Sequence, residues 1–333
     1  MQYFYSYNLG YRGEAGVTTE IGSAVHGVVE ALALIKKNIQ EDGPNFIEHS
    51  EFGKIEYDPK TFTKPYNLSD EEVDEINKSR SAVSTYKDKP FIGYGTTRHG
   101  VELVNHLMDR AIPIWLAKFD PKPAEIRNFK NYTWMLLEKV DPRFENIVSV
   151  EFHFDVEIPY EWALKEDGSR IRFKGFIDLV CEPEPGVWVI YDWKTGQRKD
   201  WNTGEVKTYA KIKQDLQLAM YYYVLSEFFT DNQIIANLFY VRDGGIFTVT
   251  FDKNSKELVE YTVKKHIEDV RSCTNPKLLS NNQSDQKCRY FCQAFKNSRF
   301  SSEMCDCAFL KNAIAKSSLE EVEKVYRRDT FEC

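Results

Sequence analysis

Apolar residues recur every three or four positions in the first part of the chain, and they alternate with polar residues from about residue 147 to residue 193. The first spacing predicts amphipathic helices and the second predicts strands. One helical stripe contains Ile21, Val25, Val28, Leu32, Ile35 and Ile39. The pattern predicts further helices near 99–118, 124–139, 206–229 and 255–272, another that begins at Ser69, and two late strands near 234–241 and 245–251. We therefore expect a helical first part, a mixed α/β centre and a short C-terminal segment.

Two acids fall at matching places on neighbouring predicted strands. The run from Ile171 to Val180 contains Asp178 and precedes the turn sequence Glu182-Pro-Glu-Pro-Gly186. The next apolar run ends in Asp192-Trp-Lys194. Hairpin pairing would bring Asp178 beside Asp192, and the two-residue period of a strand puts Lys194 on the same face as Asp192.

A pair of carboxylates beside a lysine suits phosphodiester chemistry. Two carboxylates can hold a divalent hard cation on a phosphate oxygen, with the ammonium group near the attacking water or the developing negative charge. A structural ion pair is the alternative, because buried pairs also occur without a catalytic role. The strand from Val187 to Trp193 is apolar on both faces, and such a strand does not readily carry Asp192 and Lys194 without a use for them. We therefore expect a metal–phosphate site here.

Further motifs extend this pattern in both directions along the chain. In chain order, the motifs are Gly22-Ser-Ala-Val-His26, Glu151, Asp178, Asp192-Trp-Lys194 and Gln217-Leu-Ala-Met-Tyr221. This constellation, which runs from about residue 20 to about residue 225, resembles the RecB-like branch of the PD-(D/E)XK nuclease superfamily. The CRISPR-associated RecB-like exonucleases and the nuclease domains of bacterial recombination helicases are similar.

The resemblance implies an α/β fold with a PD-(D/E)XK restriction-endonuclease-like core, in which helices flank a central mixed sheet. It implies one or two Mg²⁺ or Mn²⁺ ions held by His26, Glu151, Asp178, Asp192 and the backbone carbonyl of Trp193. It also implies that Lys194 stabilises the charge that develops as water attacks the phosphodiester, or helps to deprotonate that water. Gln217 and Tyr221 would complete the catalytic set by positioning the lysine, the water or the substrate.

Several of these assignments have alternatives in the sequence. Glu157 shares a strand face with Glu151 and is nearer to Asp178 along the chain. Either glutamate can therefore be the acid that precedes Asp178 in the family pattern. His26 lies beside an apolar stripe, where a histidine is more often a packing residue than a ligand. Gln217 and Tyr221 can equally lie at the edge of the core, because further aromatic residues follow them.

The formal net charge of the 333-residue chain is −7, which is unusual for a protein that binds DNA, because affinity for the phosphate backbone comes mainly from cations. Acidic proteins can still bind DNA through a local cationic track. The best candidate contains Arg198, Lys199, Lys207, Lys211 and Lys213, with Trp201 and Tyr209 interleaved. A solvated face is the alternative, since Asp200 and Glu205 dilute the positive charge.

No apolar run is long enough to cross a bilayer, and the first residues, Met1-Gln-Tyr-Phe-Tyr, have neither a basic leader nor an apolar core. We therefore expect a cytoplasmic protein of a bacterial or phage-infected cell, without membrane contact. The chain also has no helicase motif of the phosphate-loop kind.

The cysteines depart from the family pattern. Seven are present, and five of them lie between Cys273 and Cys307. Many RecB-like nucleases hold an iron–sulfur cluster with one cysteine upstream of the histidine, but this chain has no cysteine before Cys181. Two interpretations stay open: a C-terminal iron–sulfur or zinc site, or free thiols in a degenerate remnant of the cluster site. The candidate ligands are Cys288, Cys292, Cys305 and Cys307.

We expect three parts in the chain. Residues 1–145 form a helical N-terminal part with the His26 helix, residues 146–272 form the nuclease core, and residues 273–333 form the cysteine-containing segment. The expected activity is metal-dependent hydrolysis of DNA by an end-processing exonuclease acting on single strands or duplex ends in recombination, repair or phage DNA metabolism. A recombination or replication protein is a candidate partner. A structure-selective endonuclease of the same fold and a non-catalytic scaffold that binds DNA or protein are the alternatives.

Overall fold

The computed structural model describes residues 16–58, 98–140, 146–165, 167–199, 204–213, 215–228, 233–243, 245–251, 255–272 and 298–327. The chain forms two compact units. The larger unit consists of residues 16–198 and 208–264, and the described residues of the smaller unit are 199, 204–207, 265–272 and 298–327. The helix expected to begin at Ser69 lies outside the described residues.

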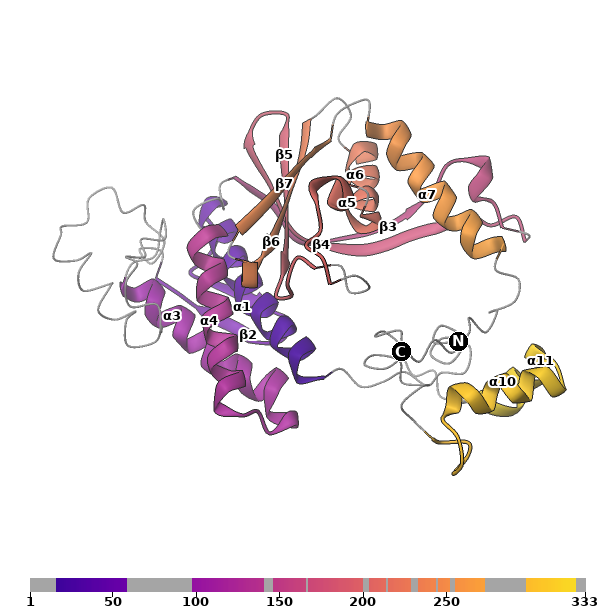
Figure 1. Ribbon diagram of the computed structural model, residues 1–333. Helices are drawn as coiled ribbons and strands as arrows, with labels where there is room; N and C mark the ends of the chain where they lie inside the picture. The colour runs from indigo at the N-terminus through magenta and orange to yellow at the C-terminus, as the bar shows by residue number, and fades with distance from the viewer. Residues whose placement is uncertain are drawn as a thin grey trace. The chain divides into compact units, whose positions relative to one another are not determined.

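The larger unit is built on a five-stranded sheet in the order β3-β4-β5-β6-β7 (Figure 1). The strands are β3 (Ile147–Glu157), β4 (Arg172–Glu184), β5 (Val187–Lys194), β6 (Gln233–Tyr240) and β7 (Gly245–Phe251). Neighbouring strands are antiparallel except for β5 and β6, which are parallel. The sheet is therefore mixed, as expected, and the apolar strand β5 is at its centre.

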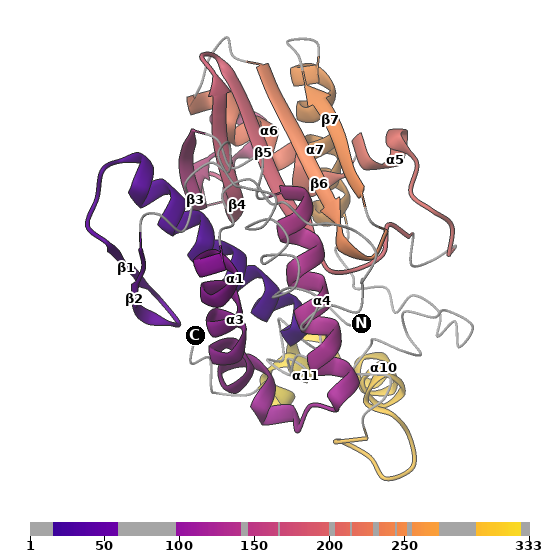
Figure 2. The same cartoon turned by 90° about the vertical axis from the view of Figure 1, so that its left-hand side faces the viewer.

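Helices cover both faces of this sheet (Figures 1 and 2). The helices are α1 (Val17–Gln40), α3 (Arg98–Ala111), α4 (Pro123–Val140), α5 (Tyr209–Lys213), α6 (Leu216–Phe228) and α7 (Ser255–Ser272). On one face, the apolar stripe of α1 forms a common core with α3, α4 and inward residues of β4 and β5 such as Leu179, Tyr191 and Trp193. On the other face, Tyr222 of α6 stacks on Phe251 of β7 with ring centroids 4.7 Å apart.

The first helices and the sheet share one hydrophobic core because α1 buries its stripe against the strands instead of against other helices alone. Helix α1 and the sheet therefore belong to one compact unit, and the expected division of the chain into three parts stays a prediction. A short hairpin, β1 (Phe46–His49) with β2 (Gly53–Glu56), follows α1 and contributes Ile47 and Ile55 to the same core.

Two expected helices differ in the structure. The region 206–229 forms two helices, α5 and α6, because the Asp215 side chain accepts the backbone N–H of Gln217 at 3.0 Å. A carboxylate that receives such a bond caps a new helix and ends continuity with the preceding one. The expected helix 99–118 is α-helical only to Ala111 and continues as a π-helical turn at Ile112–Leu116 and a 3₁₀ turn at Ala117–Phe119. The helices near 124–139 and 255–272 and the two late strands are confirmed.

In the smaller unit, two helices form their own small core. They are α10 (Asp306–Lys316) and α11 (Leu319–Tyr326). Cys307, Leu310 and Val322 are buried between them. Among the described residues of both units, no helix combines the length and the apolar character needed to cross a membrane.

Candidate metal and catalytic centre

The hairpin of β4 and β5 sets the two central acids opposite each other. Leu179 pairs with Tyr191, so the preceding residue, Asp178, and the following residue, Asp192, are neighbours across the strands. Both carboxylates are buried, at 8% and 2% exposed. Asp178 accepts the backbone N–H of Trp193 at 2.8 Å, which anchors Asp178 to β5. The sequence prediction of this hairpin is confirmed.

Helix α1 brings His26 to the same point. Its Nε2 atom is 2.9 Å from the carbonyl oxygen of Trp193, and its Nδ1 atom is 3.7 Å from Asp178 Oδ1. The imidazole therefore leaves the apolar stripe and faces the acids. Gly22 allows the close approach of α1, since a Cβ atom there would lie 3.0 Å from the Thr195 hydroxyl oxygen, just after Lys194.

Glu151, and not Glu157, reaches this group. The strand pairs on either side place Glu151 opposite Asp178, and ligand atoms of His26, Glu151 and Asp178 all lie within 4.8 Å of one another. Glu157 instead receives a hydrogen bond from Arg172 at 2.8 Å on an exposed part of the strand. The backbone of Glu151 has φ of 47°, in the left-handed region that non-glycine residues seldom adopt. Such strain is commonly retained at functional sites.

The three clustered side chains have perturbed acidity. Burial, followed by the nearby charge of Asp178, raises the pKa of Glu151 from 4.5 to about 7. Burial and the Asp192 charge raise the pKa of Asp178, and burial lowers the pKa of His26. In the metal-free protein the carboxyl groups thus tend to keep their protons and the imidazole stays neutral. A cation would reverse the cost of ionising these acids.

Lys194 belongs to a second group built around Asp192. Its Nζ atom donates to Asp192 Oδ1 and to Gln217 Oε1, each at 2.9 Å. Gln217 Nε2 donates to Asp192 Oδ1 at 3.2 Å and to the Tyr221 hydroxyl at 2.5 Å. Gln217 and Tyr221, one turn apart on α6, therefore both face Asp192 on β5. Lys213 ends the separate helix α5.

The aromatic ring of Tyr221 is buried beside the acids. Its side chain is 4% exposed, and its ring meets Phe154 edge-on with centroids 6.2 Å apart. Burial and the Asp192 charge raise the pKa of Tyr221, so the phenol stays protonated. The buried ring offers no exposed face on which a base could stack.

The donor set fits a divalent hard cation. Oxygen and imidazole ligands suit Mg²⁺ and Mn²⁺. Asp192 Oδ2 is buried and lies 2.7 Å from Lys194 Nζ, so the ammonium group partly balances its charge. A divalent cation would stabilise this buried carboxylate further.

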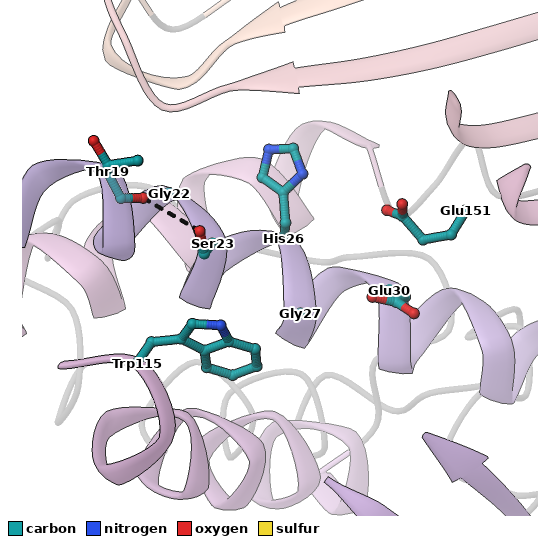
Figure 3. Close-up of a pocket in the computed structure, with 8 residues that line it drawn as sticks. All are labelled: Thr19, Gly22, Ser23, His26, Gly27, Glu30, Trp115 and Glu151. Atoms are coloured by element: carbon teal, nitrogen blue, oxygen red, sulfur yellow. Dashed lines mark hydrogen bonds between the residues drawn. The ribbon is translucent and has the colours of Figure 1, made fainter. Parts of the chain in front are cut away.

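A pocket with a volume of about 400 Å³ opens along α1 beside these residues (Figure 3). It is lined by Thr19, Gly22, Ser23, His26, Gly27, Glu30, Trp115 and Glu151. Figure 3 shows the carboxylates of Glu30 and Glu151 on the same side of His26. The Trp115 ring packs on the helix at Gly27, where a Cβ atom would lie 2.5 Å from the indole.

Sequence reasoning missed Glu30. This residue follows His26 by one helical turn, a spacing that places both on one helix face and that signals their proximity in the sequence. The charge of Glu30 contributes to the raised pKa values of Glu151 and Asp178. Its Oε2 atom is 3.5 Å from Nε2 of the buried His49. The Nδ1 atom of His49 accepts backbone N–H groups of its own turn, so the other ring nitrogen carries the proton and faces Glu30.

The predicted cationic track, which follows β5 in the sequence, is divided between the two compact units. Arg198, Lys211 and Lys213 belong to the larger unit, whereas Lys199 and Lys207 belong to the smaller unit. The Arg198 guanidinium is 4.5 Å from the centroid of the Phe247 ring on the edge strand β7. Binding of DNA by these cations stays a prediction.

Two of the four cysteines proposed as metal ligands, Cys288 and Cys292, lie outside the described residues. Cys307 is buried in the apolar core of α10 and α11, and Cys305 precedes α10. Within the part of the chain that the structure describes, neither belongs to a group of metal-ligating side chains. Packing accounts for the burial of Cys307, and the iron–sulfur or zinc site stays a prediction.

The fold and the site define a class: an α/β protein with a mixed sheet, a cluster of acids and a lysine on its central strands, and a histidine on a covering helix. Comparison with protein-family models matches residues 1–297 to the PD-(D/E)XK nuclease superfamily. The chain belongs to this superfamily, whose members are typically metal-dependent nucleases that use Mg²⁺ or Mn²⁺. No curated protein matches the chain.

Proposed function

We propose that this protein is a metal-dependent DNA nuclease, and more narrowly an end-processing exonuclease of the RecB-like branch in recombination, repair or phage DNA metabolism. One observation carries the proposal. Asp178 and Asp192 are neighbours across adjacent strands, His26 and Glu151 lie beside Asp178, and Lys194 donates a hydrogen bond to Asp192. The order of the same motifs along the chain favours the RecB-like branch.

The proposed metal ligands are His26, Glu151, Asp178, Asp192 through its Oδ2 atom, and the carbonyl oxygen of Trp193. His26 Nε2 and this carbonyl oxygen are 2.9 Å apart, which puts both beside the carboxylate of Asp178. A bound divalent ion would polarise the scissile phosphate and lower the pKa of a water molecule.

The chain's own groups orient the reaction. Asp192 and Gln217 hold the Lys194 ammonium group in place, and its side chain stays 32% exposed and can reach a phosphate oxygen. Lys194 therefore stabilises the negative charge that develops on the phosphate as water attacks. Tyr221 fixes the rotamer of Gln217 by accepting its amide N–H at 2.5 Å.

The scaffold alternative is weaker on physical grounds. A fold released from catalysis has no use for buried carboxylates whose pKa values are raised, or for a strained backbone at Glu151. The endonuclease alternative uses the same site, so the products of cleavage must distinguish it from the exonuclease.

The test uses linear single-stranded and double-stranded DNA labelled separately at each end, with Mn²⁺, Mg²⁺ or chelator. The critical variant is Lys194→Ala. Its matched control is Lys256→Ala, which removes another lysine–carboxylate contact, to Glu227 at 3.3 Å, on the surface of the larger unit. We expect metal-dependent loss of one label in the wild type and the control, and a loss of cleavage by at least about a hundredfold in Lys194→Ala, as for removal of other charge-stabilising groups.

Internal DNA fragments at early reaction times would show that the protein is an endonuclease instead of an exonuclease. Full activity of Lys194→Ala would refute the assigned site. Absence of cleavage on every substrate, with DNA binding retained, would support the scaffold.

A further inference from the structure

An exposed aromatic pair lies beside the proposed metal site. Phe176 is 56% exposed, which makes it the most exposed phenylalanine among the described residues. His153 is also exposed, and the two rings face each other across β3 and β4 with centroids 4.8 Å apart and an angle of 36° between their planes.

The strand register places this pair next to the site. Phe176 precedes Asp178 by two residues on β4, and its partner His153 follows Glu151 by two residues on β3. Residues two apart on a strand point to the same face and are separated by about 7 Å. The rings therefore lie one step along β3 and β4 from Glu151 and Asp178, within about one nucleotide of the proposed metal ligands.

Packing of the fold does not require these rings. β3 and β4 continue together beyond the last β4–β5 pair at Leu179, and in Figure 1 they run below α6. The other face of this two-stranded ribbon supplies the core contacts, because Phe154 packs on Tyr221 and Phe173 packs on Tyr223. Phe176 lies on the opposite face of the ribbon and takes no part in these core contacts.

The charged residues farther along the same ribbon are already paired. Arg172 donates to Asp155 at 2.7 Å and to Glu157 at 2.8 Å, and Lys174 is 2.9 Å from Asp155. These cations are neutralised by acids on the neighbouring strand and offer little attraction to phosphates. The aromatic faces are thus the feature of this surface that can recognise nucleic acid.

We propose that Phe176, supported by His153, is a stacking site for an unpaired nucleobase beside the scissile phosphate. Every nucleobase presents a flat π-face, so the site would accept any sequence. A base inside a duplex already has neighbours on both faces, and the site therefore favours single strands or frayed ends. This proposal rests on the nuclease function proposed above and adds its substrate class.

Steady-state cleavage of a single-stranded oligonucleotide provides the first test, with Phe176→Ala and Phe176→Trp as the variants. Loss of one stacked base is expected to raise KM by about 5- to 100-fold while kcat changes by less than about twofold. Phe176→Trp should restore KM, since it keeps a π-face. Phe176→Leu keeps apolar area without a π-face and should behave like Phe176→Ala.

The control is Tyr261→Ala on α7, which removes another exposed aromatic residue, 62% exposed, from the larger unit. Its KM should match the wild type. Thermal melting of each variant checks that it is folded. We expect folded variants, because Phe176 and Tyr261 are both exposed.

The decisive measurement is stacking itself, measured without cleavage. The Lys194→Ala protein is titrated against a single strand that contains 2-aminopurine near one end, and stacking on an aromatic ring quenches its fluorescence. We expect quenching in Lys194→Ala and its loss when Phe176→Ala is added. Quenching that survives Phe176→Ala, or that never occurs, overturns the proposal, whatever the values of KM. If no DNA is cleaved by the wild type, the nuclease proposal fails while this titration still decides the stacking site.

Discussion

Metal binding to this site should depend steeply on pH. Burial raises the pKa of Glu151 to about 7, and the charges of Asp178 and Glu30 add to the effect. A metal ligand must be ionised, so Mn²⁺ binding should displace the proton of Glu151. Burial lowers the pKa of His26, so the imidazole adds no proton to this balance above pH 7.

The magnitude follows from the pKa of Glu151. With a value of about 7, the carboxyl group is about 90% protonated at pH 6, half protonated at pH 7 and about 10% protonated at pH 8. The dissociation constant for Mn²⁺ should therefore fall about tenfold between pH 6 and pH 8, with about fivefold of this change below pH 7. The raised pKa of Asp178 can only increase the effect.

The stability of the metal-free fold should change in the opposite direction. Because the folded-state pKa of Glu151 is raised, the folded protein binds more protons than the unfolded chain between about pH 4.5 and pH 7. Stability is thus lost as pH rises through this window. The full shift would correspond to about 3 kcal/mol, and partial exposure of the side chain to water reduces this to about 1–2 kcal/mol.

Isothermal titration of the metal-free protein with Mn²⁺, in two buffers with different ionisation enthalpies, measures affinity and proton release together. Glu151→Gln should remove the part of the pH dependence that belongs to this residue. Glu30→Gln should shift the dependence to lower pH, because it removes a charge that raises the pKa of Glu151. A dissociation constant that is equal at pH 6 and pH 8, without proton release, would refute the reasoning.

Two further substitutions test the surroundings of the site. Tyr221→Phe removes the hydroxyl group that accepts the Gln217 amide, which in turn contacts Lys194, the proposed catalytic lysine. The substitution should lower kcat about tenfold and change the free energy of unfolding by less than about 1 kcal/mol; an unchanged kcat would contradict the positioning role proposed for Tyr221. Gly27→Val places side-chain atoms against the Trp115 ring and should destabilise the fold by about 3 kcal/mol in urea unfolding, whereas Gly196→Ala, where a Cβ atom meets nothing within 4 Å, should have little effect.

Local patterns predicted most of the elements. The apolar stripe of α1, the boundaries of α7 and the hairpin that pairs Asp178 with Asp192 follow from periodicity and turn residues within short segments. The helix expected over 206–229 failed at Asp215, because a single capping bond outweighed the apolar periodicity on either side.

The choice between Glu151 and Glu157 shows what a local pattern cannot resolve. The two-residue period of a strand puts both glutamates on the same face. In the structure, the left-handed φ of Glu151 and the approach of α1 bring this residue to Asp178, whereas Arg172 holds Glu157 at the surface. Similar long-range packing brings Trp115 to the pocket.

The sequence by itself determined which chemical groups are present, their order and the pairing of the two central acids, because these depend on neighbours along the chain. Only the tertiary structure decided that α1 places His26 and Glu30 against β3, β4 and β5, and that Phe176 stays exposed beside them. The physical reason is that burial, distance and pKa depend on contacts between segments far apart in the chain.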